Sequence, residues 1–138
     1  AGAAAPRQSH ERYGIMLGMA FQIADDLLDY TGSQDVTGKP TGLDLREHKV
    51  TLPLIHALPH VSADERARVE ALFAAAEPDD EQIADVISIV AKHGGLDYAR
   101  RRGELLAREA EDALSPLPDT PAKLALLDTI AYVMDRRS

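Results

Sequence analysis

The stretch MLGMAFQIADDLLDY, residues 16–30, decides the fold class of this 138-residue chain. Its apolar residues recur at steps of four, three, four and three, which is the spacing of one face of an α-helix. The three glycines and one proline that follow over residues 31–42 are typical of a loop. The pattern therefore predicts a first helix over residues 8–30. The residues on its apolar face are Met16, Ala20, Ile23, Leu27 and Tyr30.

Helical patterns continue along the rest of the chain. Ser62, followed three residues later by Glu65, is typical of a capping box. Lys92, His93 and Gly94 suit the end of a helix. Together the patterns predict an all-α protein of five or six helices. Beyond the first helix, helical patterns occur over residues 43–47 (a turn of helix), 51–58, 62–76, 83–93, 96–114 and 121–134. Thr120 is the expected N-cap of the last of these helices.

Composition narrows the classes of function. The length is that of one domain, and the net charge of −8 argues against nucleic acid or an anionic membrane as the main partner. The chain contains no Cys, which excludes disulfides and thiolate chemistry. No apolar run is long enough to suggest a transmembrane segment. We expect a cytoplasmic protein.

Three aspartates form the densest chemical pattern, D-D-x-x-D. Asp25 and Asp29 are four residues apart on the predicted helix, so their carboxylates repel each other, and all three oppose the helix dipole near its C-terminus. A divalent cation would turn this repulsion into attraction, and carboxylate oxygens are ligands that Mg²⁺ prefers. Taken alone, the pattern also fits a solvated helix end. The third acid is Asp26.

The face that carries Asp25 and Asp29 continues backwards through Gln22, Gly18 and Gly14. Each glycine costs roughly 1 kcal/mol relative to alanine inside a helix. Glycines on this face therefore indicate that another helix or an extended ligand comes close to the backbone.

The remaining candidates are weaker. Lys39 lies in the glycine-rich loop without a complete phosphate-binding motif, so it is either an exposed lysine or a cation that folds back toward the carboxylates. The five histidines show no metal spacing, and no Glu-x-x-His is present. We interpret His10, His56, His60 and His93 as surface or structural residues.

Taken together, these segments resemble the second aspartate-rich region of trans-polyprenyl diphosphate synthases, in particular the bacterial medium- and long-chain type. The matching parts occur in the right order and spacing, and weaker similarity continues to the end of the chain through Gly94-Gly95, Leu117-Pro118 and Tyr132-Val133. His48 stands where a small residue is common in that group, and we expect little effect from it. The three parts are Phe21-Gln22-x-x-Asp25-Asp26-x-x-Asp29, Gly38-Lys39-x-x-Gly42-x-Asp44-Leu45 and Lys49-x-Thr51-Leu52-Pro53.

The resemblance implies a chain-elongating prenyltransferase that condenses isopentenyl diphosphate with an allylic diphosphate and depends on Mg²⁺. Asp25 would bind the metal directly, Asp29 would do so through water, and Asp26 would complete the acidic set and orient Lys39. The catalytic residues implied are Phe21, Gln22, Asp25 and Lys39. The substrate-binding residues implied are Gln22, Lys39 and Lys49.

One part of the family pattern is absent. The family has an earlier D-D-x-x-D followed by an arginine pair, whereas this chain has only one such motif. Residues 1–138 are therefore expected to be the C-terminal part of a single polyprenyl synthetase domain within an isoprenoid-synthase helical bundle, inactive alone and prone to homodimerisation or self-association. The alternative is a non-catalytic interaction module or regulatory subunit with the same fold.

Overall fold

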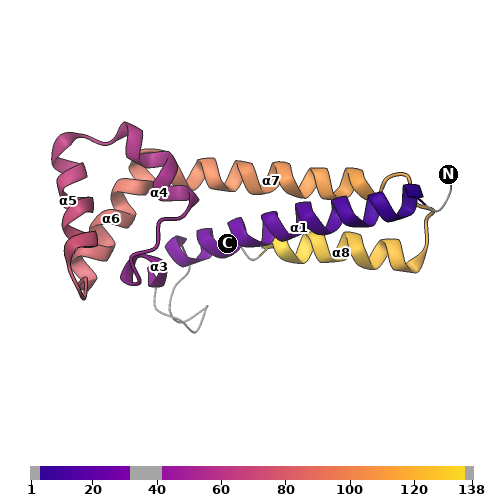
Figure 1. Cartoon of the computed structure of the whole chain (residues 1–138), viewed down its shortest axis with the longest axis horizontal. Helices are drawn as coiled ribbons and strands as arrows, with labels where there is room; N and C mark the ends of the chain where they lie inside the picture. The colour runs from indigo at the N-terminus through magenta and orange to yellow at the C-terminus, as the bar shows by residue number, and fades with distance from the viewer. Residues whose placement is uncertain (1–3, 32–41, 136–138) are drawn as a thin grey trace. The chain divides into compact units, whose positions relative to one another are not determined.

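The computed structural model describes residues 4–31 and 42–135, and their regular structure is entirely helical (Figure 1). The all-α prediction is confirmed. These residues form seven α-helices where five or six were predicted, because the turn of helix expected over residues 43–47 is a separate short helix. The helices are α1 (Ala4–Thr31), α3 (Leu43–Arg46), α4 (Leu52–Ala57), α5 (Ala63–Ala74), α6 (Asp80–Lys92), α7 (Gly95–Leu114) and α8 (Pro121–Asp135), with a 3₁₀ helix, η1 (Leu58–His60), after α4.

Local capping chemistry sets several of the helix ends. The predicted capping box of α5 is present, since the Ser62 hydroxyl accepts from the Glu65 N–H at 3.1 Å and the Glu65 carboxylate accepts from the Ser62 N–H at 2.9 Å. The Thr120 hydroxyl caps α8 by accepting from the Lys123 N–H at 3.2 Å. A second capping box, between Asp79 and Gln82, starts α6 one turn before its apolar stripe begins. The sequence pattern did not identify this box.

By packing, the chain divides into two compact units, which we call the terminal unit (residues 1–25 and 100–138) and the central unit (residues 26–99). In the terminal unit, α1, α7 and α8 lie side by side (Figure 1). The Tyr13 hydroxyl donates to the Leu126 carbonyl at 2.9 Å and ties α1 to α8. Small residues of α7 allow the helices to approach closely. The buried core residues of this unit are Tyr13, Ala107, Ala110, Ala113, Leu114 and Ile130.

The central unit is built around α4, α5 and α6. Gly95 shows how tightly its parts pack, because a Cβ there would overlap the Pro53 carbonyl oxygen and come within 2.8 Å of the Val90 side chain. Only glycine allows the start of α7 to approach α4 in this way. The buried core residues of this unit are Tyr30, Leu45, Leu54, Ala57, Val69, Leu72, Ile83, Val86, Ile89 and Val90.

A buried carboxylate joins α5 to the end of α6. The Glu65 side chain is 5% exposed and accepts from Lys92 Nζ at 3.1 Å and from His93 Nε2 at 2.8 Å. The Ser62 N–H bond and these two partners favour the charged form and lower the pKa of Glu65 to about 2. Lys92 and His93, predicted only as favourable residues at a helix end, therefore also fix α6 to the first turn of α5.

His48 adopts a left-handed backbone conformation, with φ +60°. This conformation is costly for most residues with a side chain, although histidine adopts it more readily than most. The His48 ring donates from Nε2 to the Ala75 carbonyl at 2.6 Å, and its centre lies 6.1 Å from that of Phe73. These contacts compensate for part of the backbone cost. No helix among the described residues has the length and apolar character needed to cross a membrane.

Candidate functional site

The aspartate-rich motif occupies the last turns of α1. Asp26 and Asp29 are buried, at 8% and 2% exposure, whereas Asp25 is only partly buried. Phe21 and Gln22, one turn earlier, are exposed. The three aspartates of one motif therefore have different surroundings, and this difference bears on their roles.

Asp29 connects the end of α1 to the start of α3. Its main-chain carbonyl accepts from the Gly42 N–H at 2.8 Å. Its carboxylate accepts from the N–H groups of Leu43 at 2.9 Å and Asp44 at 3.1 Å, which are the first two residues of α3. The residue that precedes α3, Gly42, provides no side-chain cap. Asp29 thus caps α3 from fourteen residues away.

Gly42 makes this closure possible. Its φ is +76°, and a Cβ at this position would overlap the Ile83 side chain. Glycine satisfies both the left-handed conformation and the close approach of α6. Gly42 belongs to the motif that resembles the family. The spacing of that motif does not show that the chain must turn back to Asp29 here, or that Ile83 leaves no room for a side chain.

Two buried hydroxyl groups lie in the same region. Neither the Tyr30 hydroxyl nor that of Thr51 has a hydrogen-bond partner of ordinary geometry in the part of the chain that is described. Burial raises the pKa of Tyr30 well above its usual range; the nearby Thr51 hydroxyl offsets part of this rise, and the carboxylates of Asp29, Asp44 and Asp26 add to it. The Tyr30 hydroxyl therefore stays protonated and can donate to a negatively charged oxygen.

The two candidate lysines are Lys39 and Lys49. Lys39 lies outside the described residues. The Lys49 side chain is 60% exposed and forms an ion pair with Glu47 at 3.0 Å. This pair raises the pKa of Lys49, with Asp44 and Asp29 contributing at longer range. Lys49 therefore keeps its positive charge, and the carboxylates of Asp29 and Asp44 raise its pKa as they raise that of Tyr30.

The terminal unit leaves one side of α1 uncovered. A Cβ added at Gly14 or Gly18 would meet no atom outside its own stretch of helix within 4 Å. The expected close neighbour of these glycines is therefore not supplied by the described residues. We call this surface the open face of α1. Its members are Gly14, Ile15, Gly18, Met19, Phe21 and Gln22, of which Ile15 is 59% and Met19 45% exposed.

The donors present suit a hard divalent cation but do not enclose one. The described residues contain no group of three or more histidine, aspartate or glutamate side chains placed to hold a metal ion. Mg²⁺ does not need such a cage, since one or two carboxylates, water and substrate phosphates normally complete its octahedral shell. Oxygen donors at Asp25 and Asp29 fit that mode of binding.

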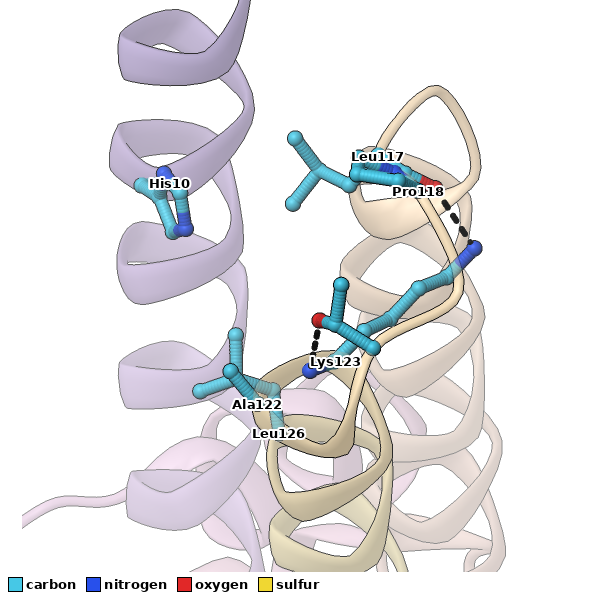
Figure 2. Close-up of a pocket in the computed structure, with 7 residues that line it drawn as sticks. His10, Leu117, Pro118, Ala122, Lys123 and Leu126 are labelled. Atoms are coloured by element: carbon cyan, nitrogen blue, oxygen red, sulfur yellow. Dashed lines mark hydrogen bonds between the residues drawn. The ribbon is translucent and has the colours of Figure 1, made fainter.

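A separate hollow of about 340 Å³ lies in the terminal unit, between α1 and the start of α8 (Figure 2). His10 faces Leu117 and Pro118 across it. The Lys123 ammonium group donates to the Leu117 carbonyl at 3.0 Å and to the Asp119 carboxylate at 3.1 Å. The walls are mainly apolar and include none of the predicted site residues, so this hollow is not part of the candidate site.

Comparison with known proteins identifies the family of the chain. The family model described as polyprenyl synthetase matches residues 1–90. Octaprenyl diphosphate synthase of Haemophilus influenzae is 39% identical over 136 residues, and a short chain isoprenyl diphosphate synthase of Methanothermobacter thermautotrophicus is 33% identical over 126 residues. A polyprenyl synthase from Caulobacter crescentus, solved with calcium and isoprenyl diphosphate, has a TM-score of 0.88 and 31% identity.

The extent of these matches is uneven. They cover 98%, 91% and 98% of this chain, respectively, but only 41%, 38% and 41% of the three relatives. The chain therefore spans about two fifths of the length of the proteins that it matches. The family model covers more than half of the chain, and the chain belongs to the polyprenyl synthetase family.

Proposed function

We propose that this chain carries one Mg²⁺–diphosphate half-site of a chain-elongating prenyltransferase that joins isopentenyl diphosphate to an allylic diphosphate. We also propose that residues 1–138 form one partial domain of that enzyme. The observation that carries the proposal is the open face of α1, which runs from two glycines past Phe21 and Gln22 to Asp25. A helix face of this composition suits an apolar chain that ends in a diphosphate.

The carboxylates have separate roles in this proposal. Asp25 holds Mg²⁺ directly, and Asp29 contributes through water because backbone N–H groups already occupy its carboxylate. Asp26 completes the acidic set and orients Lys39. Bound Mg²⁺ supplies positive charge that stabilises the departing diphosphate.

The remaining residues act on the organic part of the substrate. The carbon–oxygen bond of the allylic diphosphate breaks, the double bond of isopentenyl diphosphate supplies the electrons for the new carbon–carbon bond, and a proton is then lost. Phe21 and Gln22 border the reacting carbons, where an aromatic face stabilises a developing cation. Lys39 contacts the allylic diphosphate, and Lys49 adds positive charge on the diphosphate side.

The binding part of the proposal is testable by calorimetry with Mg²⁺ and inorganic diphosphate. We expect binding by the wild-type chain and its loss in Asp25→Ala. Asp128→Ala, which removes an exposed acid of α8, should bind like wild type. Identical heats for wild type and Asp25→Ala would overturn the assignment.

The catalytic part of the proposal predicts no turnover by the 138-residue chain alone. This sequence contains one D-D-x-x-D motif, whereas the family pattern has two. An assay with radiolabelled isopentenyl diphosphate and an allylic diphosphate measures this directly. Elongated product from the isolated chain would contradict the half-site proposal.

The uncovered apolar side chains lead to a proposal about assembly. Leu124 and Tyr132 of α8 are 61% and 67% exposed, in addition to the open face of α1. Burying such side chains against a second copy is favourable, so we expect a homodimer or larger self-association. Light scattering should show species larger than 15.0 kDa, whereas a monodisperse monomer would contradict this expectation.

A further inference from the structure

Three aromatic side chains of the central unit form a row that has no role in the proposed prenyl transfer. The ring centres of His56 and His60 are 5.6 Å apart, with 50° between their planes. His56 also stacks on Tyr98, with ring centres 4.1 Å apart and planes only 4° from parallel. His56 is half-buried and His60 is exposed, so the pair is open to solvent.

His56 and His60 are four residues apart in the sequence, so the prediction of no metal spacing among the histidines overlooked this pair. The predicted helical piece ends at residue 58, which leaves His60 in a loop. In the structure, η1 continues the turn directly after α4 and carries His60 to the same side as His56. The pair thereby gains the one-turn relation that metal-binding histidines use on helices.

The spacing suits two ligands of one ion. Two imidazoles bound to one tetrahedral ion have ring centres roughly 5 Å apart, because each Zn–N bond is about 2.0–2.1 Å long. The observed 5.6 Å is close to this separation. No ring nitrogen of His56 or His60 has a hydrogen-bond partner within the described part of the chain. Each ring can therefore offer one nitrogen lone pair for coordination.

Both rings are carried by supported backbone. The parallel stack on Tyr98 restrains the plane of the His56 ring. The guanidinium group of Arg66 donates to the Leu58 carbonyl at 2.9 Å and thereby attaches η1 to α5. Such restraint lowers the entropy that binding an ion would otherwise cost.

We propose that His56 and His60 form a two-imidazole site for a transition-metal ion such as Zn²⁺, Ni²⁺ or Cu²⁺, which imidazole ligands favour over Mg²⁺. No third acidic or histidine side chain in the described ranges completes a cage, so water fills the remaining positions. The site is independent of the aspartate-rich motif and does not rest on the proposed prenyl transfer.

A Zn²⁺ titration of the full chain tests this proposal, with millimolar Mg²⁺ present to occupy carboxylate sites. Calorimetry gives the affinity, and NMR of the imidazole groups identifies the histidines that respond. We expect the signals of His56 and His60 to shift together. His56→Gln and His60→Gln should each weaken binding at least about tenfold, since even outer-shell changes at metal sites cost ~10–100-fold in affinity.

Matched variants separate coordination from general effects. His10→Gln, in the terminal unit, should bind Zn²⁺ like wild type. Tyr98→Phe keeps the stack and should retain affinity, whereas Tyr98→Ala should weaken it while circular dichroism still shows a folded chain. Absence of Zn²⁺ binding, wild-type affinity in His60→Gln, or loss in His93→Gln without loss in His60→Gln would each overturn the proposal.

Discussion

Helix α1 has two regions with opposite surroundings. Along the open face, Gly14 and Gly18 have empty space where a Cβ would stand, and Ile15 and Met19 are exposed. In the last turns, Asp29 is buried and accepts three backbone N–H groups. The first region has residues that weaken an isolated helix, whereas the second uses a charged side chain to hold the fold together.

This contrast separates the aspartates of one motif. A buried acid with its oxygens already bonded to the main chain is needed for folding, whatever else it binds. An acid that is only partly buried, next to an open face, is better placed to meet a ligand. We therefore regard Asp29 mainly as a closing residue and Asp25 mainly as a binding residue, and the following predictions test this division.

The largest effect is expected for Asp29→Ala. It removes two hydrogen bonds to a charged acceptor and leaves the N–H groups that start α3 without a cap, so the free energy of unfolding should fall by about 3 kcal/mol. Asp25→Ala, at an acid that is only partly buried, should lower it clearly less. Equal losses for the two variants in urea unfolding would remove the distinction.

The next effect concerns acid stability and Glu65. Its pKa is lowered in the folded chain from 4.5 to about 2, so the charged carboxylate stabilises the fold above about pH 4.5. This contribution is lost progressively as the pH falls from 4.5 toward 2. Glu65→Gln should therefore flatten the dependence of stability on pH in this range. Glu70→Gln, an exposed substitution on the same helix, serves as the control. Parallel curves for wild type and Glu65→Gln would exclude the linkage.

The smallest effect has the opposite sign. Gly18→Ala should raise the free energy of unfolding by up to about 1 kcal/mol, because the added methyl group meets open space and alanine is the better helix former. At Gly103 of α7 the same change places a Cβ 3.4 Å from Ile23, so the gain should be smaller. Thermal melts of both variants measure the difference. A destabilised Gly18→Ala would show that the open face is covered.

The sequence predicts what depends on neighbours along the chain. The helical pattern, the Ser62–Glu65 capping box and the start of α8 at Pro121 are all local features, and the structure confirms them. The placement of Asp25, Asp26 and Asp29 on one helix also follows from spacing alone.

Other features depend on contacts that spacing does not encode. Asp29 reaches N–H groups fourteen and fifteen residues away, and Glu65 reaches Lys92 and His93 across 27 and 28 residues. These groups meet only because helices pack. The sequence pattern therefore predicted a metal role for Asp29 and a local cap for Glu65, but not these long-range contacts. Similarly, His56 and His60 come together only because η1 follows α4.

A thermal melt with and without Mg²⁺ and inorganic diphosphate tests the division between Asp25 and Asp29 most directly. Ligand that binds only the folded chain raises its melting temperature. We expect a rise for wild type and no rise for Asp25→Asn, each measured against the melting temperature of the same protein without ligand. A rise of the same size in Asp25→Asn would contradict the assignment of Asp25 as the binding aspartate.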